Sequence, residues 1–462
     1  MTGSLARCLP GWRPLDRILV CGSADQVRGG LIGCRTTPGT RGPEGSLCYN
    51  GHNRRPPTDK LPHIENPLEF IQRNTSGGYK TALNALRGRA LDHGDQIYLV
   101  GGQVRDAILG RVVNDLDFSV EGDAVALAQW LAEEIGGKTV VHPRFGTATV
   151  VAEGSRTDRV MARRESYAHP GSLPQVAPGK IRDDLARRDF SINALAIPLT
   201  AGPPQVLDDA EGIEDLRLGV VRILHEESFT DDPTRVFRAI RYEQRLGFRI
   251  DEMTLVQLKD AVDRGLVANL SPDRIRHEVQ RILKEEDPGP ALGRCLGLGV
   301  LRAVHPSLSN LNALAGVTAN SHEIESVNGA DRSMVYLAAL VSYLSQMEGE
   351  ELISRLNMPE TWRRVVRDSI HLQGIAGELN DESLSGSRLA RLLDGLSVEA
   401  VTALWLGGDN KTVSQRSRRY LTELRHVQPA LNGKDLLRLG VPPGPLVGNI
   451  LGRLRDDALD GT

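Results

Sequence analysis

Apolar positions along the chain first follow an alternating helix and strand pattern. Asn66 followed by Pro67 is typical of a helix start, and a second helical pattern covers residues 79–91. The apolar run at residues 97–100, which ends in a glycine pair, is typical of a buried strand. Segments of both kinds then alternate, so we expect a mixed α/β domain over residues 66–200.

The second half of the chain follows a helical pattern alone. From Asp232 onward apolar residues recur every three or four positions, and no segment repeats at a fixed spacing. We therefore expect an α+β protein: a head with a small mixed sheet, followed by an all-helical neck, body and tail. The head is assigned to residues 66–200, the neck to 201–290, and the body with the tail to 291–462. Within the head, the Pro- and Gly-rich residues 168–179 are predicted to form a loop.

The first 65 residues differ from the rest in composition. They are rich in Gly, Pro and Arg and lack the apolar core of a signal peptide. They also contain four of the five cysteines, spaced too widely for a zinc site, at Cys8, Cys21, Cys34 and Cys48. We interpret residues 1–65 as a disordered extension, or as translated sequence upstream of the true start. The cysteines are expected to be free thiols, as in a reducing cytoplasm.

Length and charge limit the class of protein. At roughly 100–200 residues per domain, 462 residues suggest about three domains. No apolar run reaches the roughly 18–20 residues of a membrane-spanning helix, so no membrane association is expected. The chain has 56 basic and 59 acidic residues, a net charge of −3. Taken alone, this balance argues against a nucleic-acid binder, because such domains are usually strongly basic.

Two aspartates on a predicted strand are the strongest candidates for chemistry. Side chains alternate along a strand, so Asp115 and Asp117 share one face, and the apolar residues between and after them occupy the other. An exposed strand edge gives the same pattern. However, paired carboxylates repel each other unless a cation lies between them, and hard oxygen ligands suit Mg²⁺. Upstream, Gly102 allows a close approach of the backbone to a ligand, and Arg105 can meet a phosphate.

These segments resemble the class II tRNA nucleotidyltransferase and poly(A) polymerase family. The resemblance rests on GGQVRDAILGRVVNDLDF and continues in RRESY, RRDF, DPTRVFRAIRY, SPDR and LNGKDL. It implies a nucleotidyltransferase head in which Asp115 and Asp117 bind two catalytic metal ions, taken as Mg²⁺. It also implies a possible third carboxylate at Asp158, although Arg159 stands where the family has an apolar residue.

The helix predicted to begin at Asp232 carries a row of arginines. A solvated arginine face is one interpretation. The alternative is base recognition, because cytosine and adenine present an amino donor beside a ring-nitrogen acceptor, and uracil and guanine present the opposite polarity. A carboxylate at Asp232 and a guanidinium at Arg235 match the first pattern. The resemblance assigns base selection to these two residues, although Asp231 stands where the family has Glu.

The resemblance also implies the remaining nucleotide contacts. An arginine of the pair Arg187 and Arg188 would bind the triphosphate, and Asp189 would bind the ribose hydroxyl. The full set of predicted nucleotide-binding residues is Gly102, Arg105, Arg187, Arg188, Asp189, Asn193, Asp232, Arg235, Arg238 and Arg241. RNA contacts are predicted at Arg274 and on a basic helix, at Arg416, Arg418 and Arg419. The helical half would hold tRNA by shape and phosphate contacts.

We therefore predict addition of C, C and A, from CTP and ATP, to the 3′ end of tRNA. The segment between Tyr167 and Asp184 has the full length of the family's flexible loop, which favours an enzyme able to add A. Three alternatives remain open: a poly(A) polymerase, an enzyme that adds only CC or only A, and a non-catalytic RNA-binding relative. The C-terminal residues are not basic, which argues against the first, and the intact aspartate pair argues against the last.

Overall fold

The computed structural model describes residues 66–461 except 114, 143–146, 153–154, 168–170, 173 and 201–204, and of residues 155–161 it describes the backbone only. The predictions for residues 1–65, including those for their four cysteines, lie outside the described residues. All described residues belong to one unit, which spans Asn50–Thr462. We keep the names head, neck, body and tail for the residue ranges given above.

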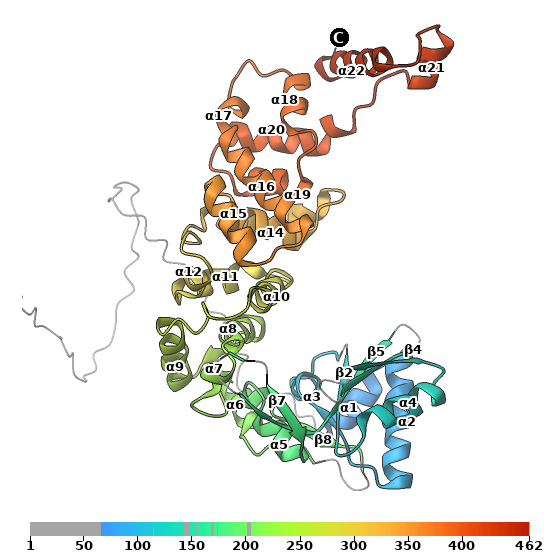
Figure 1. The fold of residues 1–462 in the computed structure, drawn as a ribbon, viewed down its shortest axis with the longest axis vertical. Coiled ribbons are helices and arrows are strands. Elements are labelled where there is room, and N and C mark those ends of the chain that lie inside the picture. The colour runs from blue at the N-terminus through green and yellow to red at the C-terminus, as the bar shows by residue number, and fades with distance from the viewer. Residues whose placement is uncertain are drawn as a thin grey trace, which may run out of the picture. The chain divides into compact units, whose positions relative to one another are not determined.

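The head begins where the sequence predicts. The Asn66 side chain accepts a hydrogen bond from the Glu69 N–H at 3.1 Å and so caps the first helix. The second helix ends at Gly94, which adopts the left-handed conformation. Helices and strands then alternate as expected up to α4, after which five strands follow one another among the described residues (Figure 1). The head comprises α1 (Pro67–Asn74), α2 (Gly77–His93), β1 (Ile97–Val100), α3 (Gly102–Ile108), β2 (Leu116–Val120), α4 (Ala124–Glu134), β3 (Lys138–His142), β4 (Thr147–Ala152), β5 (Ser155–Met161), β6 (Arg163–Ser166), β7 (Gln175–Pro178), α5 (Ile181–Ala186), the 3₁₀ helix η2 (Ser191–Asn193) and β8 (Ala196–Pro198).

Six of these strands form the mixed sheet that the sequence predicts, in the order β3-β4-β5-β2-β1-β8. β2 pairs in parallel with β5 and antiparallel with β1. Leu116 and Phe118 of β2 are fully buried, and α2 and α4 pack against the sheet. β2, which carries the aspartate pair, is therefore paired with a strand on each edge, and helices pack against its sheet. These contacts make its position rigid.

The prediction of a loop over residues 168–179 is wrong for its second part. β7 pairs antiparallel with β6, with Arg163 opposite Pro178 and Ser166 opposite Gln175. Proline is tolerated here because β6 and β7 form a two-stranded sheet of their own, in which each strand has an edge that needs no donor. β6 and β7 thus form a hairpin that packs against α5.

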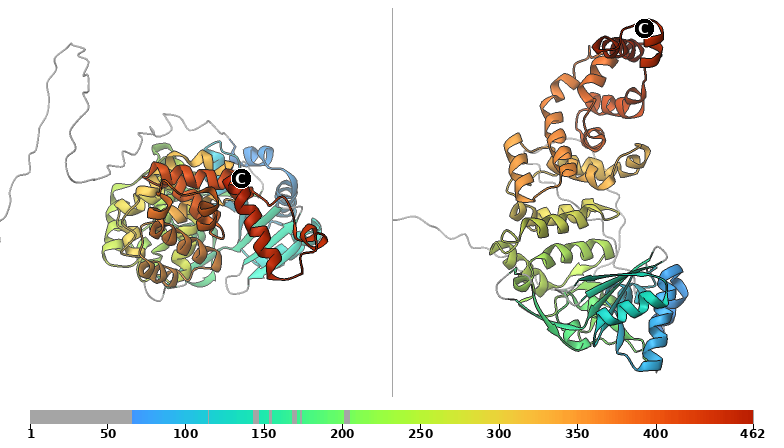
Figure 2. Two further views of the ribbon diagram at one scale, coloured as in Figure 1. Left: turned by 90° about the horizontal axis from the view of Figure 1, so that it is seen from above. Right: turned by 45° about the vertical axis from the view of Figure 1, so that its right-hand side comes forward.

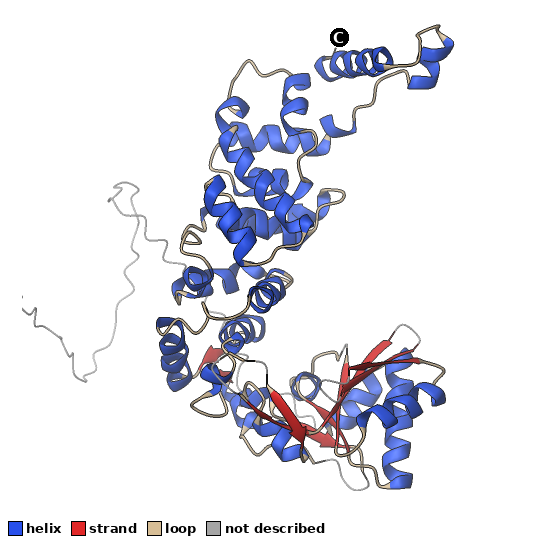
Figure 3. Ribbon diagram, in the orientation of Figure 1, coloured by secondary structure: helices blue, strands red, loops and turns tan. Residues whose placement is uncertain are grey.

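The neck is mostly but not wholly helical. It contains α6 (Gly212–Leu218), β9 (Val220–Val221), α7 (Ser228–Asp231), α8 (Thr234–Leu246), β10 (Arg249–Ile250), α9 (Glu252–Asp263) and α10 (Pro272–Leu283). The prediction of an all-helical neck is corrected by β9 and β10, which pair in parallel. Two-residue strands have no detectable period in the sequence, and only the turn at Gly247 brings this pair together. Figure 3 shows the strands of the described residues in the head and at this position of the neck.

The body and tail are helical, as expected, and Figure 2 shows them from two further sides. They comprise α11 (Pro288–Gly297), α12 (Val300–Val304), α13 (Asn312–Ala319), η3 (Ser321–Ser326), α14 (Arg332–Val341), α15 (Gln346–Arg355), α16 (Glu360–Gly374), α17 (Ala376–Leu379), α18 (Gly386–Leu393), α19 (Val398–Gly407), α20 (Lys411–Thr422), η4 (Leu424–His426), α21 (Gly433–Arg438) and α22 (Pro445–Asp460). The α+β fold predicted from the sequence is confirmed.

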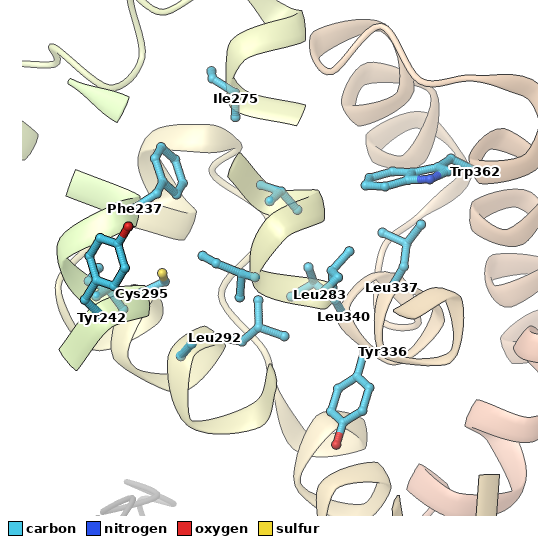
Figure 4. Packing of buried hydrophobic residues seen from close by; sticks show 14 of the residues in the cluster. Phe237, Tyr242, Ile275, Leu283, Leu292, Cys295, Tyr336, Leu337, Leu340 and Trp362 are labelled. Carbon is cyan, nitrogen blue, oxygen red and sulfur yellow. The ribbon is translucent and has the colours of Figure 1, made fainter. Parts of the chain in front are cut away.

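A continuous hydrophobic core joins the neck to the body. Figure 4 shows Tyr242 of α8, Leu283 of α10, Cys295 of α11 and Tyr336 of α14 along this core. Cys295 is a free thiol, and its burial raises its pKa to about 12, so it stays protonated. One side of helix α8 therefore packs in this core, and the core fixes the position of the arginines on its other side. Among the described residues, no helix is both long and apolar enough to cross a membrane.

Candidate active site

The aspartate pair lies where β2 begins. Asp115 is exposed and Asp117 is half-buried, and Leu116 and Phe118 are fully buried. The alternation predicted from the sequence is therefore present. The Gln103 side chain donates a hydrogen bond to the Asp117 carbonyl oxygen at 2.6 Å, which ties α3 to β2 at this point.

The donor set fits a hard divalent cation. Two carboxylates two residues apart on one rigid strand offer oxygen ligands, which Mg²⁺ prefers. Asp158 of β5 is the register partner of Asp117 in the parallel pairing of β2 and β5, so its backbone stands at the position expected for a third carboxylate. In the ranges whose side chains are described, no group of three or more His, Cys, Asp or Glu could hold a metal ion. The third carboxylate at Asp158 stays a prediction.

The glycine pair before α3 makes room for an arginine. Gly101 has φ +80°, and a Cβ on it would lie 2.6 Å from Nη1 of Arg188. A Cβ on Gly102 would make ordinary contact, 3.5 Å from Nη2 of Arg105. The first glycine is thus required by its conformation, and a side chain there would displace the Arg188 guanidinium; neither holds for the second glycine. The Arg188 guanidinium lies against the backbone that leads into α3.

Four of the predicted nucleotide-binding residues form one buried network. Arg105 Nη1 donates to Asn193 Oδ1 at 2.7 Å, and Asn193 Nδ2 donates to Asp189 Oδ1 at 3.0 Å. Asp189 Oδ2 accepts from Arg238 Nε at 2.7 Å. The guanidinium carbons of Arg105 and Arg238 also lie 5.2 and 5.5 Å from the centre of the Tyr242 ring. Residues 88 positions apart in the chain are therefore connected by direct hydrogen bonds.

The hydrogen-bonding capacity of Asp189 is filled within the protein. Its Oδ1 accepts from the Phe190 N–H at 2.9 Å and from Asn193, and its Oδ2 accepts from both Nε and Nη2 of Arg238. A carboxylate offers about four lone-pair positions. Although burial raises its pKa, Arg238 and Asn193 outweigh that effect and hold it at about 2. A ribose hydroxyl could contact Asp189 only if one of these donors moved.

The arginine pair is oriented by an aspartate that the sequence analysis did not single out. Asp184 is fully buried; its Oδ1 accepts from Arg187 Nη2 at 2.5 Å, and its Oδ2 accepts from Arg188 Nη2 at 3.1 Å. Burial raises the pKa of Asp184, but the two guanidinium groups outweigh it and the pKa is lowered. Arg187 Nη1 also donates to Glu165 at 2.9 Å. The available signal was the spacing, since Asp184 lies three and four positions before the arginines.

The arginines of α8 are not a solvated face. The exposed fractions of Arg235 and Arg241 are only 5% and 7%. The helix itself begins at Thr234, with Pro233 at the N-cap, and the Asp232 carboxylate accepts a hydrogen bond from the Thr234 N–H at 3.0 Å. The Arg235 guanidinium does not bind the Asp232 carboxylate: it donates to Ser228 Oγ at 2.7 Å and to the Arg187 carbonyl oxygen at 2.8 Å. The two residues predicted to select the base are thus held by separate partners.

The residues predicted to contact RNA lie in two places. Arg274 is in the neck, where it donates to Asp232 Oδ1 at 2.5 Å. The other three lie on α20 of the body. Arg416 donates to the Leu379 carbonyl oxygen at 2.5 Å, and Arg418 and Arg419 are exposed. Arg274 therefore lies beside Asp232, one of the two residues predicted to select the base, and the exposed pair on α20 stays a predicted RNA contact.

Two parts of the chain match known domain families. Residues 97–222 match the family described as "Poly A polymerase head domain". Residues 247–311 match the family described as "Probable RNA and SrmB- binding site of polymerase A". The aspartate pair and the arginine pair lie within the first match, and the arginines of α8 lie between the two matches.

Relatives over the whole chain define the family. The A-adding tRNA nucleotidyltransferase of Halalkalibacterium halodurans is 33% identical over 420 residues, which cover 87% of this chain and 93% of that protein. The A-adding enzyme of Geobacter sulfurreducens is 35% identical over 79% of this chain, which spans 43% of the relative's length. The CC-adding tRNA nucleotidyltransferase of Deinococcus radiodurans is 32% identical, and the match covers 78% of this chain and 83% of that protein. The chain belongs to the tRNA nucleotidyltransferase family.

Solved structures agree with this assignment. A CCA-adding enzyme in an apo form has a TM-score of 0.74 and 29% identity, and the match covers 86% of this chain and 95% of the other. The Thermotoga maritima CCA-adding enzyme complexed with tRNA has a TM-score of 0.70 and 28% identity, with the same coverage. The family resemblance and the fold predicted from the sequence motifs are both confirmed.

Proposed function

We propose that this tRNA nucleotidyltransferase adds C, C and A, from CTP and ATP, to the 3′ end of tRNA. The observation that carries the proposal is the buried network that runs from Arg105 through Asn193 and Asp189 to Arg238. It joins the helix beside the aspartate pair to the helix that follows Asp232. A nucleotide bound along this network would have its phosphates near the aspartates and its base near α8.

The reaction transfers a nucleotidyl group. The terminal 3′ oxygen of the RNA attacks the α-phosphorus, its proton is lost, and the bond to the bridging oxygen breaks to release pyrophosphate. Asp115 and Asp117 would hold Mg²⁺, which lowers the pKa of the attacking hydroxyl and stabilises the leaving group when bound. These two side chains thereby orient the attacking group, and their rigid strand fixes where the charge is held.

The arginines would bind the triphosphate. Arg187 and Arg188 are fixed by Asp184, and planar guanidinium groups match phosphate oxygens well. Nε of Arg188 and Nε of Arg241 are buried and have no hydrogen-bond partner among the described residues. Buried donors of this kind are normally satisfied, and because neither is open to solvent a ligand could reach them only if the side chains moved. The support for the predicted nucleotide site is the pairing of Arg187 and Arg188 with Asp184.

Asp232 and Arg235 would select the base. The carboxylate would accept from the exocyclic amino group of cytosine or adenine, and the guanidinium would donate to the ring nitrogen. UTP and GTP would place a carbonyl against the carboxylate and an N–H against the guanidinium. Such a mismatch leaves buried polar groups unpaired, which is the strong form of discrimination. Exposed basic residues on α20 would contact the phosphates of tRNA, a duplex that offers little sequence information.

Addition of A alone is the second candidate. The relatives with 35% and 33% identity are A-adding enzymes, and a CC-adding relative has 32%. The full length of the segment between Tyr167 and Asp184 favours an enzyme able to add A, but it does not separate A addition from CCA addition. A cytoplasmic location, expected from the cysteines, stays a prediction.

One assay separates these activities. Purified protein with Mg²⁺ and labelled CTP or ATP is offered tRNA that ends before CCA, after C, and after CC. A CCA-adding enzyme extends all three, an A-adding enzyme extends only the third, and long A tails on any RNA would identify a poly(A) polymerase.

The aspartate pair provides the control for the mechanism. Asp115→Ala together with Asp117→Ala should abolish incorporation, and the same double change at two exposed aspartates, Asp92 of the head and Asp209 of the neck, should not. Incorporation that survives the first double change would overturn the mechanism. Failure of the wild type to extend any tRNA would overturn the proposed function.

A further inference from the structure

Arg274 joins two parts of the molecule that are distant in the sequence. It lies in the first turn of α10, where Nη2 donates to Asp232 Oδ1 at 2.5 Å, and Nη1 donates to the Gly171 carbonyl oxygen at 2.7 Å. The partners are 42 and 103 positions away in the chain. One planar guanidinium thus holds both the base-selecting carboxylate and the connection between β6 and β7.

Gly171 is docked on the segment that carries Asp232. Its N–H donates to the Thr230 carbonyl oxygen at 3.3 Å, and its own carbonyl oxygen binds Arg274. It has φ +69°, and a Cβ on it would lie 3.7 Å from both Pro233 and Leu270. Both backbone polar groups of Gly171 are therefore engaged with the neck.

The hydrogen bonds of Asp232 are gathered on one oxygen. Oδ1 accepts from the Thr234 N–H at 3.0 Å, from Thr234 Oγ1 at 2.5 Å and from Arg274. None of the hydrogen bonds between described residues uses Oδ2. Three donors on Oδ1 fix the rotation of the carboxylate, so Oδ2 is held in one direction and keeps its capacity to accept.

We propose that Arg274 is a positioning residue for base selection and does not act through RNA. The inference rests on the proposed function, because it takes Asp232 as the acceptor for the amino group of the base. The side chains of Arg274 and Asp232 are 21% and 24% exposed, so solvent screens their pairing only in part. By fixing one oxygen of Asp232, Arg274 orients the other toward the base, and it ties this orientation to Gly171.

The test measures kcat/KM for CTP, UTP, ATP and GTP in the wild type and in the variants Arg274→Ala and Arg274→Lys. For Arg274→Ala we expect the ratio of kcat/KM for CTP to that for UTP to fall about tenfold, the loss typical of one charge-assisted hydrogen bond. The ratio for ATP to GTP should fall in parallel. The Kd for tRNA should change less than about twofold, because the guanidinium is engaged within the protein.

Two further arms separate positioning from general damage. Arg274→Lys keeps the charge beside Asp232 but cannot span both partners, so we expect an intermediate ratio. Free guanidinium ion at low concentration should partly restore the ratio in Arg274→Ala. Arg264→Ala is the matched control, because Arg264 is 52% exposed and pairs only with Asp260 at 3.0 Å. If Arg274→Ala fails to fold, the intermediate ratios expected for Arg274→Lys still test the proposal.

The outcomes distinguish this inference from the proposed function. If Arg274→Ala leaves the CTP to UTP and ATP to GTP ratios of kcat/KM unchanged and weakens tRNA binding tenfold or more, then Arg274 is an RNA contact and the inference is refuted. Equilibrium binding of CTP and UTP gives the ratio without turnover. An inactive wild type would therefore refute the proposed function, and the binding ratio would still decide the role of Arg274.

Discussion

Replacing Asp189 by asparagine removes a negative charge from the centre of the nucleotide-binding network. The side chain is 8% exposed, and the amide that replaces it can accept on one side only. Arg238, whose side chain is 28% exposed, would lose the carboxylate that accepts from its Nε at 2.7 Å. The change therefore tests whether Asp189 acts by holding Arg238 or by touching ribose.

The size of the effect follows from the pKa. The folded protein holds the pKa of Asp189 at about 2 instead of the ordinary 3.8. At about 1.4 kcal/mol per pKa unit, this difference corresponds to about 2 kcal/mol. Removing one partner of a buried ion pair costs roughly 3–5 kcal/mol, and the partial exposure of Arg238 moderates that cost. We expect Asp189→Asn to lower the local free energy of unfolding by about 3 kcal/mol.

The assay is urea-dependent hydrogen exchange of the α8 amides, Thr234–Leu246, which reports local opening. Because the pKa is lowered in the folded state, the stabilisation is fully present above the ordinary value and is lost only as the pH falls toward 2. The difference between wild type and variant should therefore be the same at pH 5 and at pH 8. In steady-state assays, KM should rise by similar factors for CTP and dCTP.

The opposite pattern would refute this reasoning. If α8 is as stable as in the wild type and the preference for CTP over dCTP collapses, then Asp189 contacts the ribose hydroxyl directly. Asp209→Asn is the matched control, because Asp209 is half exposed and lies 3.5 Å from an exposed Arg182. A surface pair of this kind should contribute less than about 1 kcal/mol.

Three other changes test separate features. Gly101→Ala should raise KM for CTP and ATP about tenfold in steady-state kinetics, because the added Cβ would displace Arg188. Gly102→Ala should raise these KM values less, and equal effects of the two changes would contradict this prediction. Asp184→Asn should raise the same KM values about tenfold, because an amide oxygen can keep only one of the two arginines, and unchanged values would show that the arginines orient themselves. Trp362→Ala, at a site 4% exposed, should cost about 3–5 kcal/mol in urea unfolding, with KM for CTP unchanged.

Local physical chemistry made part of the molecule predictable. Three features depend on neighbours within about four residues and are therefore visible in the sequence. They are the helix cap at Asn66, the left-handed end of α2 at Gly94, and the alternation of buried and exposed side chains around Asp117. The strand at residues 175–178 was missed because its pairing with residues 163–166 overrides the local signal of Pro and Gly.

The partners of the charged groups were decided by the tertiary structure. The sequence by itself placed Asp115 and Asp117 on one face and a row of arginines on one helix, because both follow from backbone period. It could not tell that Arg235 and Arg241 are buried, that Asp184 holds Arg187 and Arg188, or that Arg274 meets Gly171 across 103 residues. Burial and pairing of charges depend on segments brought together from far along the chain, and no local period records them.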